Sequence, residues 1–237
     1  MSRVISYAQN FEDIVLKRIF SYLGSSKGKY IDVGARHSQE DSVTYLFYLN
    51  DWTGINIEPD PYLFDDLDRA RIKDINLNCA VSDNIGTAIL HSTGRGAYKG
   101  LSTLDNTNAT SLNSMLIQTE EVEVNLKSLN SIIEENNWQN EEIHFLKIDV
   151  EGSEFKVLKS IDLQKYRPIV LVVEATMPMT TIKNHMIFED YIINNNYTFC
   201  LFDGLNRFYV ANERSDLFEI ASYPACIFDH PFIQKYH

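Results

Sequence analysis

The sequence predicts one α/β domain built on a mostly parallel, doubly wound sheet, and three observations support this prediction. Short apolar runs of strand-like composition alternate with amphipathic helical patterns along most of the chain. Strands that alternate with helices in this way form parallel sheets covered by helices on both faces. The length of 237 residues fits one such domain, and 44% of the residues are hydrophobic, which is enough to fill its core.

Four apolar runs are predicted to be strands of this sheet. They lie at 30–34, 54–59, 144–150 and 168–174. The last run is rich in β-branched residues without interruption, which is typical of a strand covered on both faces. A further strand is expected to end near Ser82. Two later runs flank a Gly-containing turn, and this pattern predicts an antiparallel hairpin over 197–211.

Helical patterns lie between the strands, at 41–50, 61–71 and 153–160. The second begins with a Pro directly after Asp60, which is a typical helix start. The segment 91–114 contains three Gly and many Ser, Thr and Asn, so a long functional loop is expected there. We expect a single domain over 1–237. Its parts are a helical N-terminal lid at 1–28, a core of sheet and helices at 29–211, and a C-terminal tail at 212–237.

Charge and composition exclude several classes of partner. The formal net charge is −12, and a field of that sign repels nucleic acid and anionic lipid. The longest apolar run, at 169–173, is far too short to span a bilayer. The three cysteines show no spacing typical of a metal site, and the N-terminal residues show no signal-peptide pattern. We therefore expect a cytoplasmic protein with no nucleic-acid partner and no stable membrane insertion.

Acidic residues end several of the predicted strands, namely Asp32, Glu58, Asp149 and Glu174. Ligands of open α/β sheets bind outside the carboxyl ends of the strands. Because the carboxyl ends of parallel strands share one edge, these four side chains are expected to belong to one site.

The turn after the first strand indicates which cofactor this site accepts. A single Gly34 follows Asp32, whereas a dinucleotide site would need the fuller GxGxxG pattern to hold a pyrophosphate. Glu58 lies 24 positions after Gly34, close to the spacing of an acidic residue that binds both ribose hydroxyls. Ser82 and Asp83 either line an adenine or form an ordinary turn, and both interpretations stay open.

The segment 147–154 places alternating charges at the end of a buried strand. Buried charges need partners or a function. One interpretation is a pair between Lys147 and a carboxylate, followed by a capped helix. The other places Asp149 beside a reacting group.

Taken together, these motifs resemble the FkbM family of S-adenosylmethionine-dependent methyltransferases. The matching stretches are 30–35, 54–59, 78–83, 101–105 and 146–154. Two further stretches, 6–13 and 202–210, resemble a subgroup that modifies sugars. One departure is Arg36-His37 after the Gly34 turn, where many relatives have smaller or less basic residues.

The resemblance implies a Rossmann-like class I methyltransferase fold, with a seven-stranded, mostly parallel sheet and an antiparallel C-terminal hairpin. It implies S-adenosyl-L-methionine as cofactor and a hydroxyl as methyl acceptor. The acceptor would be a sugar, a sugar nucleotide or a glycan, such as a surface polysaccharide or natural-product precursor. The cofactor-binding residues would be Gln9, Asp32, Gly34, Ala35, Glu58, Pro59, Ser82, Asp83 and Asp149.

The acceptor hydroxyl must lose its proton during transfer, so a base is expected near the strand ends. The candidates for catalysis are His37, Asp149 and Glu174, with Glu151 as a further acid. Alternatively, Asp149 and Glu174 hold a divalent metal such as magnesium, which lowers the hydroxyl pKa. The residues expected to contact the acceptor are Glu12, Asp13, Glu151, Asp203 and Asn206.

Two other functions compete with methyl transfer. A cofactor- or glycan-binding domain without turnover would have the same motifs. A nicotinamide-dependent oxidoreductase would need GxGxxG and a catalytic Tyr-Lys or similar pair, and neither arrangement is found. Whether the protein is a homo-oligomer is left open by the sequence.

Overall fold

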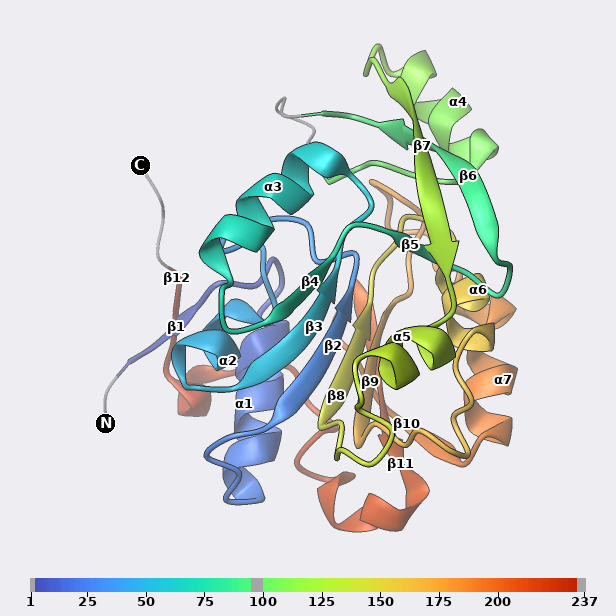
Figure 1. Ribbon diagram of the computed structural model, residues 1–237. Coiled ribbons are helices and arrows are strands. Elements are labelled where there is room, and N and C mark those ends of the chain that lie inside the picture. Colours follow the sequence, from blue (N-terminus) through green and yellow to red (C-terminus); the bar gives the residue numbers. More distant parts are fainter. Residues whose placement is uncertain (1–2, 95–99, 234–237) are drawn as a thin grey trace.

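A seven-stranded sheet forms the centre of the molecule in the computed structural model, which describes residues 3–94 and 100–233 (Figure 1). Its strands are β2 (Lys29–Val33), β3 (Thr53–Ile57), β4 (Ile75–Leu77), β8 (Phe145–Ile148), β9 (Val170–Glu174), β10 (Tyr197–Phe202) and β11 (Asn206–Ala211). The strand order is β10-β11-β9-β8-β2-β3-β4. β11 is antiparallel to both of its neighbours, and β9, β8, β2, β3 and β4 are parallel. The predicted mixed α/β fold with a seven-stranded sheet is confirmed.

Helices cover both faces of this sheet (Figure 1). The α-helices are α1 (Glu12–Tyr22), α2 (Tyr45–Leu49), α3 (Pro61–Ala70), α4 (Asn106–Ser114), α5 (Leu129–Glu135), α6 (Glu154–Lys159) and α7 (Glu189–Asn194). One core cluster joins α5, α6 and α7 to the sheet, and a second joins α1 and α2 to the other face. Alternate residues of β2 enter the two clusters: Tyr30 packs in the second, whereas Ile31 and Val33 pack in the first.

Helix α1 shows why the N-terminal segment is fixed against the sheet. Val15, Leu16, Ile19 and Phe20 recur at helical spacing and are buried in the second core cluster.

Short 3₁₀ helices lie at η1 (His185–Ile187), η2 (Asn212–Leu217) and η3 (Ile227–Asp229). After η3, strand β12 (Pro231–Ile233) pairs in parallel with β1 (Val4–Ser6). The two ends of the described chain therefore lie side by side.

A smaller three-stranded sheet extends over the carboxyl edge of the main one. It consists of β5 (Ala80–Val81), β6 (Gly86–Ser92) and β7 (Glu120–Lys127), in the order β5-β7-β6. The strand expected to end near Ser82 therefore divides into two: β4 stays in the main sheet, and β5 joins the smaller one. The predicted hairpin region contains β10 and β11, which pair antiparallel.

The prediction of a long loop at 91–114 is partly wrong. Strand β6 continues to Ser92, and α4 begins at Asn106. The Asp105 carboxylate caps this helix by accepting hydrogen bonds from the backbone N–H groups of two residues in its first turn. Its apolar contacts come from Ala109 and Leu112 alone, so the hydrophilic composition concealed the helix. Within the same segment, 95–99 lie outside the described residues.

The predicted helix at 41–50 is also shorter than expected, since α2 begins at Tyr45. Asp41 adopts a positive φ of 52°, which is incompatible with a right-handed helix.

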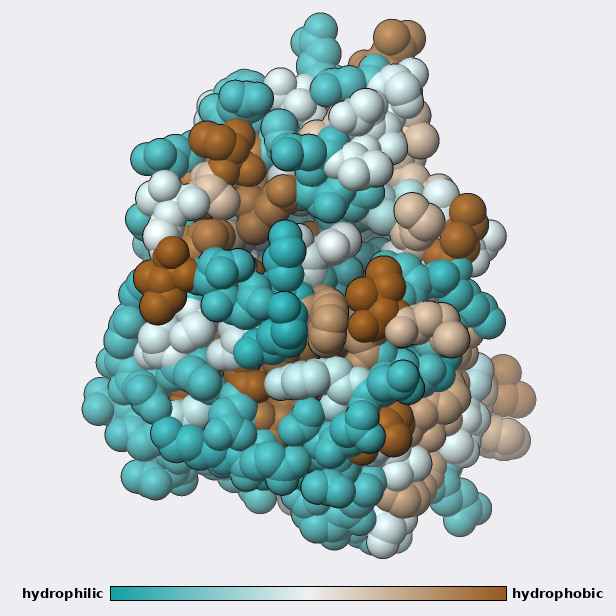
Figure 2. Space-filling view, turned by 90° about the vertical axis from the view of Figure 1, so that its right-hand side faces the viewer, coloured by the Kyte–Doolittle hydropathy of each residue, from teal (hydrophilic) through white to brown (hydrophobic). Residues whose placement is uncertain are grey.

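On the face that carries α4, α6 and α7, exposed hydrophobic side chains are dispersed among hydrophilic ones (Figure 2). In the part of the chain that the structure describes, no helix combines the length and apolar composition of a membrane span.

Candidate active site

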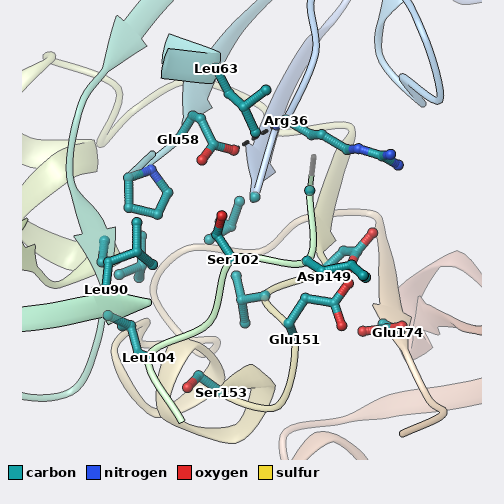
Figure 3. A pocket seen from close by; sticks show the side chains of 18 of the residues that line it. Arg36, Glu58, Leu63, Leu90, Ser102, Leu104, Asp149, Glu151, Ser153 and Glu174 are labelled. Atoms are coloured by element: carbon teal, nitrogen blue, oxygen red, sulfur yellow. Dashed lines mark hydrogen bonds between the residues drawn. The ribbon is translucent and has the colours of Figure 1, made fainter. Parts of the chain in front are cut away.

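A cavity of about 900 Å³ opens at the carboxyl ends of β2, β3, β8 and β9 (Figure 3). The smaller sheet and the segments 100–104 and 176–182 contribute its other walls. We call one part of it the apolar end, which is lined by Ile57, Leu63, Val81, Leu90 and Leu104. We call the other part the acidic end, which is lined by Asp149, Glu151 and Glu174. The cavity thus combines an apolar surface with a concentrated negative charge.

Glu58 lies beside the apolar end, and the backbone holds its carboxylate in place. Its Oε2 accepts a hydrogen bond of 2.7 Å from the Arg36 backbone N–H, and its Oε1 accepts one of 2.8 Å from that of Asp60. Burial raises the pKa of Glu58 to about 7, although these two hydrogen bonds lower it. Each carboxylate oxygen keeps a lone pair for a further donor.

Asp60 joins the smaller sheet to the rim of the cavity. Its Oδ1 caps α3 by accepting from the Tyr62 backbone N–H at 3.0 Å. Its Oδ2 accepts from the hydroxyls of Ser92 at 2.5 Å and Ser102 at 2.8 Å. The Asp60 carboxylate therefore holds the start of α3 next to the end of β6 and the cavity segment 100–104.

Gly34 is required by the close approach of two strand ends. Its φ is 76°, and a Cβ at this position would lie 1.8 Å from the carbonyl oxygen of Asp149. The missing side chain thus accommodates the backbone after β8, although Gly34 also lines the cavity. A ligand is not needed to explain this glycine.

Lys147 and Asp32 form a buried ion pair beneath the cavity. The Nζ of Lys147 lies 3.3 Å from Asp32 Oδ1 and 3.5 Å from Asp149 Oδ2, and it donates to the Gly34 carbonyl at 2.7 Å. Burial favours the neutral amine, but the carboxylates of Asp32 and Asp149 raise the pKa of Lys147 above its usual value. Asp32 also accepts from the Thr44 hydroxyl at 3.0 Å. This pair holds the end of β2 against the end of β8.

The three acids of the acidic end lie close together. One carboxylate oxygen from each of Asp149, Glu151 and Glu174 lies within 4.8 Å of the other two. Glu174 is only 6% exposed. Burial raises the pKa of Glu151 to about 8, with a further contribution from the charge of Asp149. Burial and the same neighbouring acids raise the pKa of Glu174 well above its usual range.

The backbone after β8 directs Glu151 into this cluster. Glu151 has a φ of 52°, a conformation that non-glycine residues seldom adopt. Its carbonyl accepts hydrogen bonds from Thr103 Oγ1 at 2.9 Å and Asn108 Nδ2 at 2.7 Å. On the other side, Glu154 Oε1 accepts from the Gly152 backbone N–H at 3.0 Å. A smaller cavity of about 120 Å³, between α4 and residues 177–180, shares Glu151 with the main one.

The structure brings only some of the predicted cofactor and catalytic residues to the cavity wall. Those that line it are Gln9, Gly34, Glu58, Pro59, Asp149, Glu151 and Glu174. Ala35 is buried, and Asp83 forms an ion pair with Lys159. Ser82 accepts a hydrogen bond from the Asn84 backbone N–H at 3.2 Å. His37 Nδ1 accepts from the Glu40 backbone N–H at 3.0 Å, and its Nε2 lies 3.5 Å from Asp66.

The predicted acceptor residues of the N-terminal segment and the hairpin turn are hydrogen-bonded within the protein. Glu12 accepts from the Asn10 backbone N–H at 2.8 Å and from Asn206 Nδ2 at 2.7 Å, and Asn10 Nδ2 donates to the Asp203 carbonyl at 3.1 Å. Asp13 accepts from the Ser6 hydroxyl at 2.7 Å. These contacts attach the segment that contains Gln9 to the β10–β11 turn.

Several cavity residues were missed by sequence reasoning. The apolar residues Leu63, Leu90 and Leu104 meet only because the smaller sheet covers the main one. The segment 176–182 follows β9 directly and carries no motif. Arg36 also lines the cavity, and its guanidinium lies 3.0 Å from Asp41. Its position directly after the Gly34 turn was the one available signal.

One comparison with known proteins gives a match. A family model described as the methyltransferase FkbM domain matches residues 32–199, which is well over half of the chain. The matched region begins within β2 and ends within β10, so it contains Glu58 and all three residues of the acidic end. No curated protein matches the chain.

Proposed function

The chain belongs to the FkbM methyltransferase family, and from that premise we propose that it transfers a methyl group from S-adenosylmethionine to a hydroxyl of a sugar or glycan. The acceptor would be a free sugar, a sugar nucleotide or a glycan precursor. The observation that carries the proposal is a single cavity with Glu58 beside an apolar surface and three acids at the opposite end. The strand order, with β11 antiparallel, supports a Rossmann-like class I methyltransferase fold.

The cavity residues suit the parts of this cofactor. The volume of the cavity, about 900 Å³, lies within the usual range for small-molecule sites. The apolar end would bind the adenine, and the remaining lone pairs of Glu58 would accept from the two ribose hydroxyls. Gln9 and Arg36 line the cavity and would donate hydrogen bonds to the methionine carboxylate. S-adenosylmethionine supplies, when bound, a methyl group already activated by its sulfonium.

The acidic end would manage the proton of the acceptor. A sugar hydroxyl has a high pKa, and a positioned base typically contributes ~10²–10⁴-fold to such a step. Asp149, Glu151 and Glu174 line the cavity and offer carboxylate oxygens that accept from the hydroxyl. We favour these acids over His37, because its Nδ1 already accepts from backbone N–H groups.

The division of the chain and its location in the cell are further parts of the proposal. Residues 1–28 would act as a lid, since Gln9 contributes to the cavity wall and Glu12 attaches this segment to the hairpin turn. The core at 29–211 would carry the reaction, in the cytoplasm.

Calorimetric titration tests the cofactor. S-adenosylhomocysteine should bind at one site per chain and NAD should not, because the turn after β2 has the single Gly34 where a dinucleotide site would have GxGxxG. Transfer of labelled methyl from S-adenosylmethionine to a panel of sugars and sugar nucleotides then tests the acceptor. Binding of NAD in place of S-adenosylhomocysteine would exclude this function. If S-adenosylhomocysteine binds but no methyl group is transferred to any hydroxyl, the protein is a binding domain and not an enzyme of this kind.

A further inference from the structure

The acidic end holds more negative charge than the neighbouring side chains neutralise. Asp149, Glu151 and Glu174 contribute three carboxylates within 4.8 Å. Lys147 contacts one of them, Asp149, at 3.5 Å, and it shares its charge with Asp32 at 3.3 Å. Arg36 also attracts Glu151, but its guanidinium is paired with Asp41 at 3.0 Å. Carboxylates this close repel one another unless a proton or a cation lies between them.

Two carboxylate oxygens of this cluster are also buried without a partner. The Oε2 atoms of Glu151 and Glu174 have no hydrogen-bond partner among residues 3–94 and 100–233. With 6% of its surface exposed, Glu174 is more than nine-tenths buried, and its carboxylate points toward that of Glu151 in the cavity (Figure 3). A buried carboxyl group is stable when it holds a proton, is paired with a cation or binds a metal. The free oxygens are therefore available to a cation that displaces the protons.

We propose that Asp149, Glu151 and Glu174 bind one hard divalent cation of the magnesium or manganese type. Magnesium binds oxygen ligands at about 2.1 Å in an octahedron, so neighbouring ligands lie about 3.0 Å apart. The three oxygens lie within 4.8 Å of one another, so side-chain rotations that close this spacing would bring them to one ion. All three donors are carboxylates, which suit a hard cation better than zinc, whose sites commonly contain nitrogen or sulfur ligands.

The cation would determine how the acceptor binds. Three carboxylates leave open positions of an octahedral ion on the side that faces the cavity. A hydroxyl bound there would be held at the acidic end with its pKa lowered by the metal. The role of this hydroxyl rests on the proposed function, whereas the binding of the ion does not.

Manganese titration of the metal-free protein, followed by electron paramagnetic resonance, tests the site. We expect one Mn²⁺ per chain. Glu151→Gln and Glu174→Gln keep the side-chain volume, remove one ligand charge each, and should weaken binding at least tenfold. The matched control is Glu121→Gln, which neutralises an exposed acid on β7 and should leave binding unchanged. Thermal unfolding of each variant shows whether it is folded.

Titration of the same proteins with S-adenosylhomocysteine separates the two proposals. If the product binds but Mn²⁺ does not, or if neither glutamine variant weakens Mn²⁺ binding, the metal site is wrong and the proposed function stands. If Mn²⁺ binds as expected but the product does not, the metal site stands and the proposed function is wrong. Equal weakening in Glu121→Gln would show diffuse attraction to a negative surface and would also refute the site.

Discussion

The two ends of the cavity hold buried carboxylates in opposite ways. Glu58 lies against the apolar end, and both of its oxygens accept hydrogen bonds from backbone N–H groups, at 2.7 and 2.8 Å. Glu174 is buried to a similar degree, but its Oε2 has no partner in the described part of the chain. The backbone thus donates hydrogen bonds to both oxygens of Glu58. One oxygen of Glu174 stays available to a proton, a cation or a ligand.

Under the proposed function, this difference would divide the cavity into an end that recognises the cofactor and an end that carries out the reaction. A carboxylate satisfied by the backbone is preorganised and needs no rearrangement to accept a ligand. A carboxylate without partners is unstable alone, and that instability makes it reactive toward protons, cations or substrate hydroxyls. The following experiments are ordered from the largest expected effect to the smallest.

Asp149→Asn tests the acidic end most severely. Turnover should fall by ~10²-fold or more, because the change removes a carboxylate from the reacting end. Asn has nearly the same shape, so the thermal unfolding temperature should stay close to that of the wild type. Labelled methyl transfer measures the effect, with Glu121→Gln as control. A fully active variant would remove Asp149 from the mechanism.

Glu58→Ala tests the apolar end. Affinity for S-adenosylhomocysteine should fall by about 1–3 kcal/mol, the usual scale for lost hydrogen bonds to a charged group. Glu174→Ala, by contrast, should change that affinity by less than about threefold, or ~0.7 kcal/mol. Calorimetry on both variants measures the contrast. Equal losses in the two variants would mean that the ends do not have separate roles.

Stability should respond in opposite directions at the two ends. In metal-free buffer at neutral pH, Glu174→Gln should raise the free energy of unfolding by ~0.5–2 kcal/mol. Burial and neighbouring acids raise the pKa of Glu174, so the folded form must hold a proton that the unfolded form releases, and the glutamine removes this cost. Glu58→Ala should lower the free energy of unfolding, because the backbone N–H groups of Arg36 and Asp60 lose their acceptor. Urea unfolding measures both. A destabilised Glu174→Gln variant would show that its carboxylate has a partner in solution.

The smallest expected effect is on pH dependence. Burial raises the pKa of Glu58 to about 7 from its ordinary 4.5, although the backbone hydrogen bonds from Asp60 and Arg36 oppose the shift. Between these values the folded form keeps a proton that the unfolded form has lost, so stability falls as pH rises. The free energy of unfolding of the wild type, relative to Glu58→Ala, should fall between pH 5 and 7 by up to ~1.4 kcal/mol per unit. Urea unfolding at several pH values measures this slope, and a rising difference would contradict it.

Part of this architecture follows directly from the sequence. Alternating strands and helices predicted the α/β sheet, and parallel strands necessarily bring their carboxyl ends to one edge. The position of Glu58, Asp149 and Glu174 at that edge needed no further information. By contrast, the smaller sheet and α4 depend on distant contacts. The Ser102 hydroxyl reaches Asp60, 42 positions away, and Thr103 reaches the carbonyl of Glu151, 48 positions away.

The partners of each carboxylate could not be predicted for the same reason. Glu58 and Glu174 both stand at the ends of predicted strands. The sequence indicates a helix start after Asp60, but it does not show which carboxylate the backbone N–H groups reach. The difference arises because the chain after Glu58 turns toward α3 and directs the Asp60 N–H at the carboxylate, and because the turn after β2 supplies the Arg36 N–H. After Glu174 the chain leaves the sheet and reverses through a turn, with Thr176 paired antiparallel to Lys183.

The parallel pairing of β1 with β12 has a consequence for how the protein is handled. Val4 pairs with Pro231, and Arg18 of α1 binds Asp229 at 2.7 Å, so residues near the C-terminus steady the strand that leads to Gln9. Proteolytic clipping after η2 would remove these contacts and so loosen a wall of the cavity from more than two hundred positions away in the sequence. The integrity of the C-terminal segment therefore belongs among the variables of any assay.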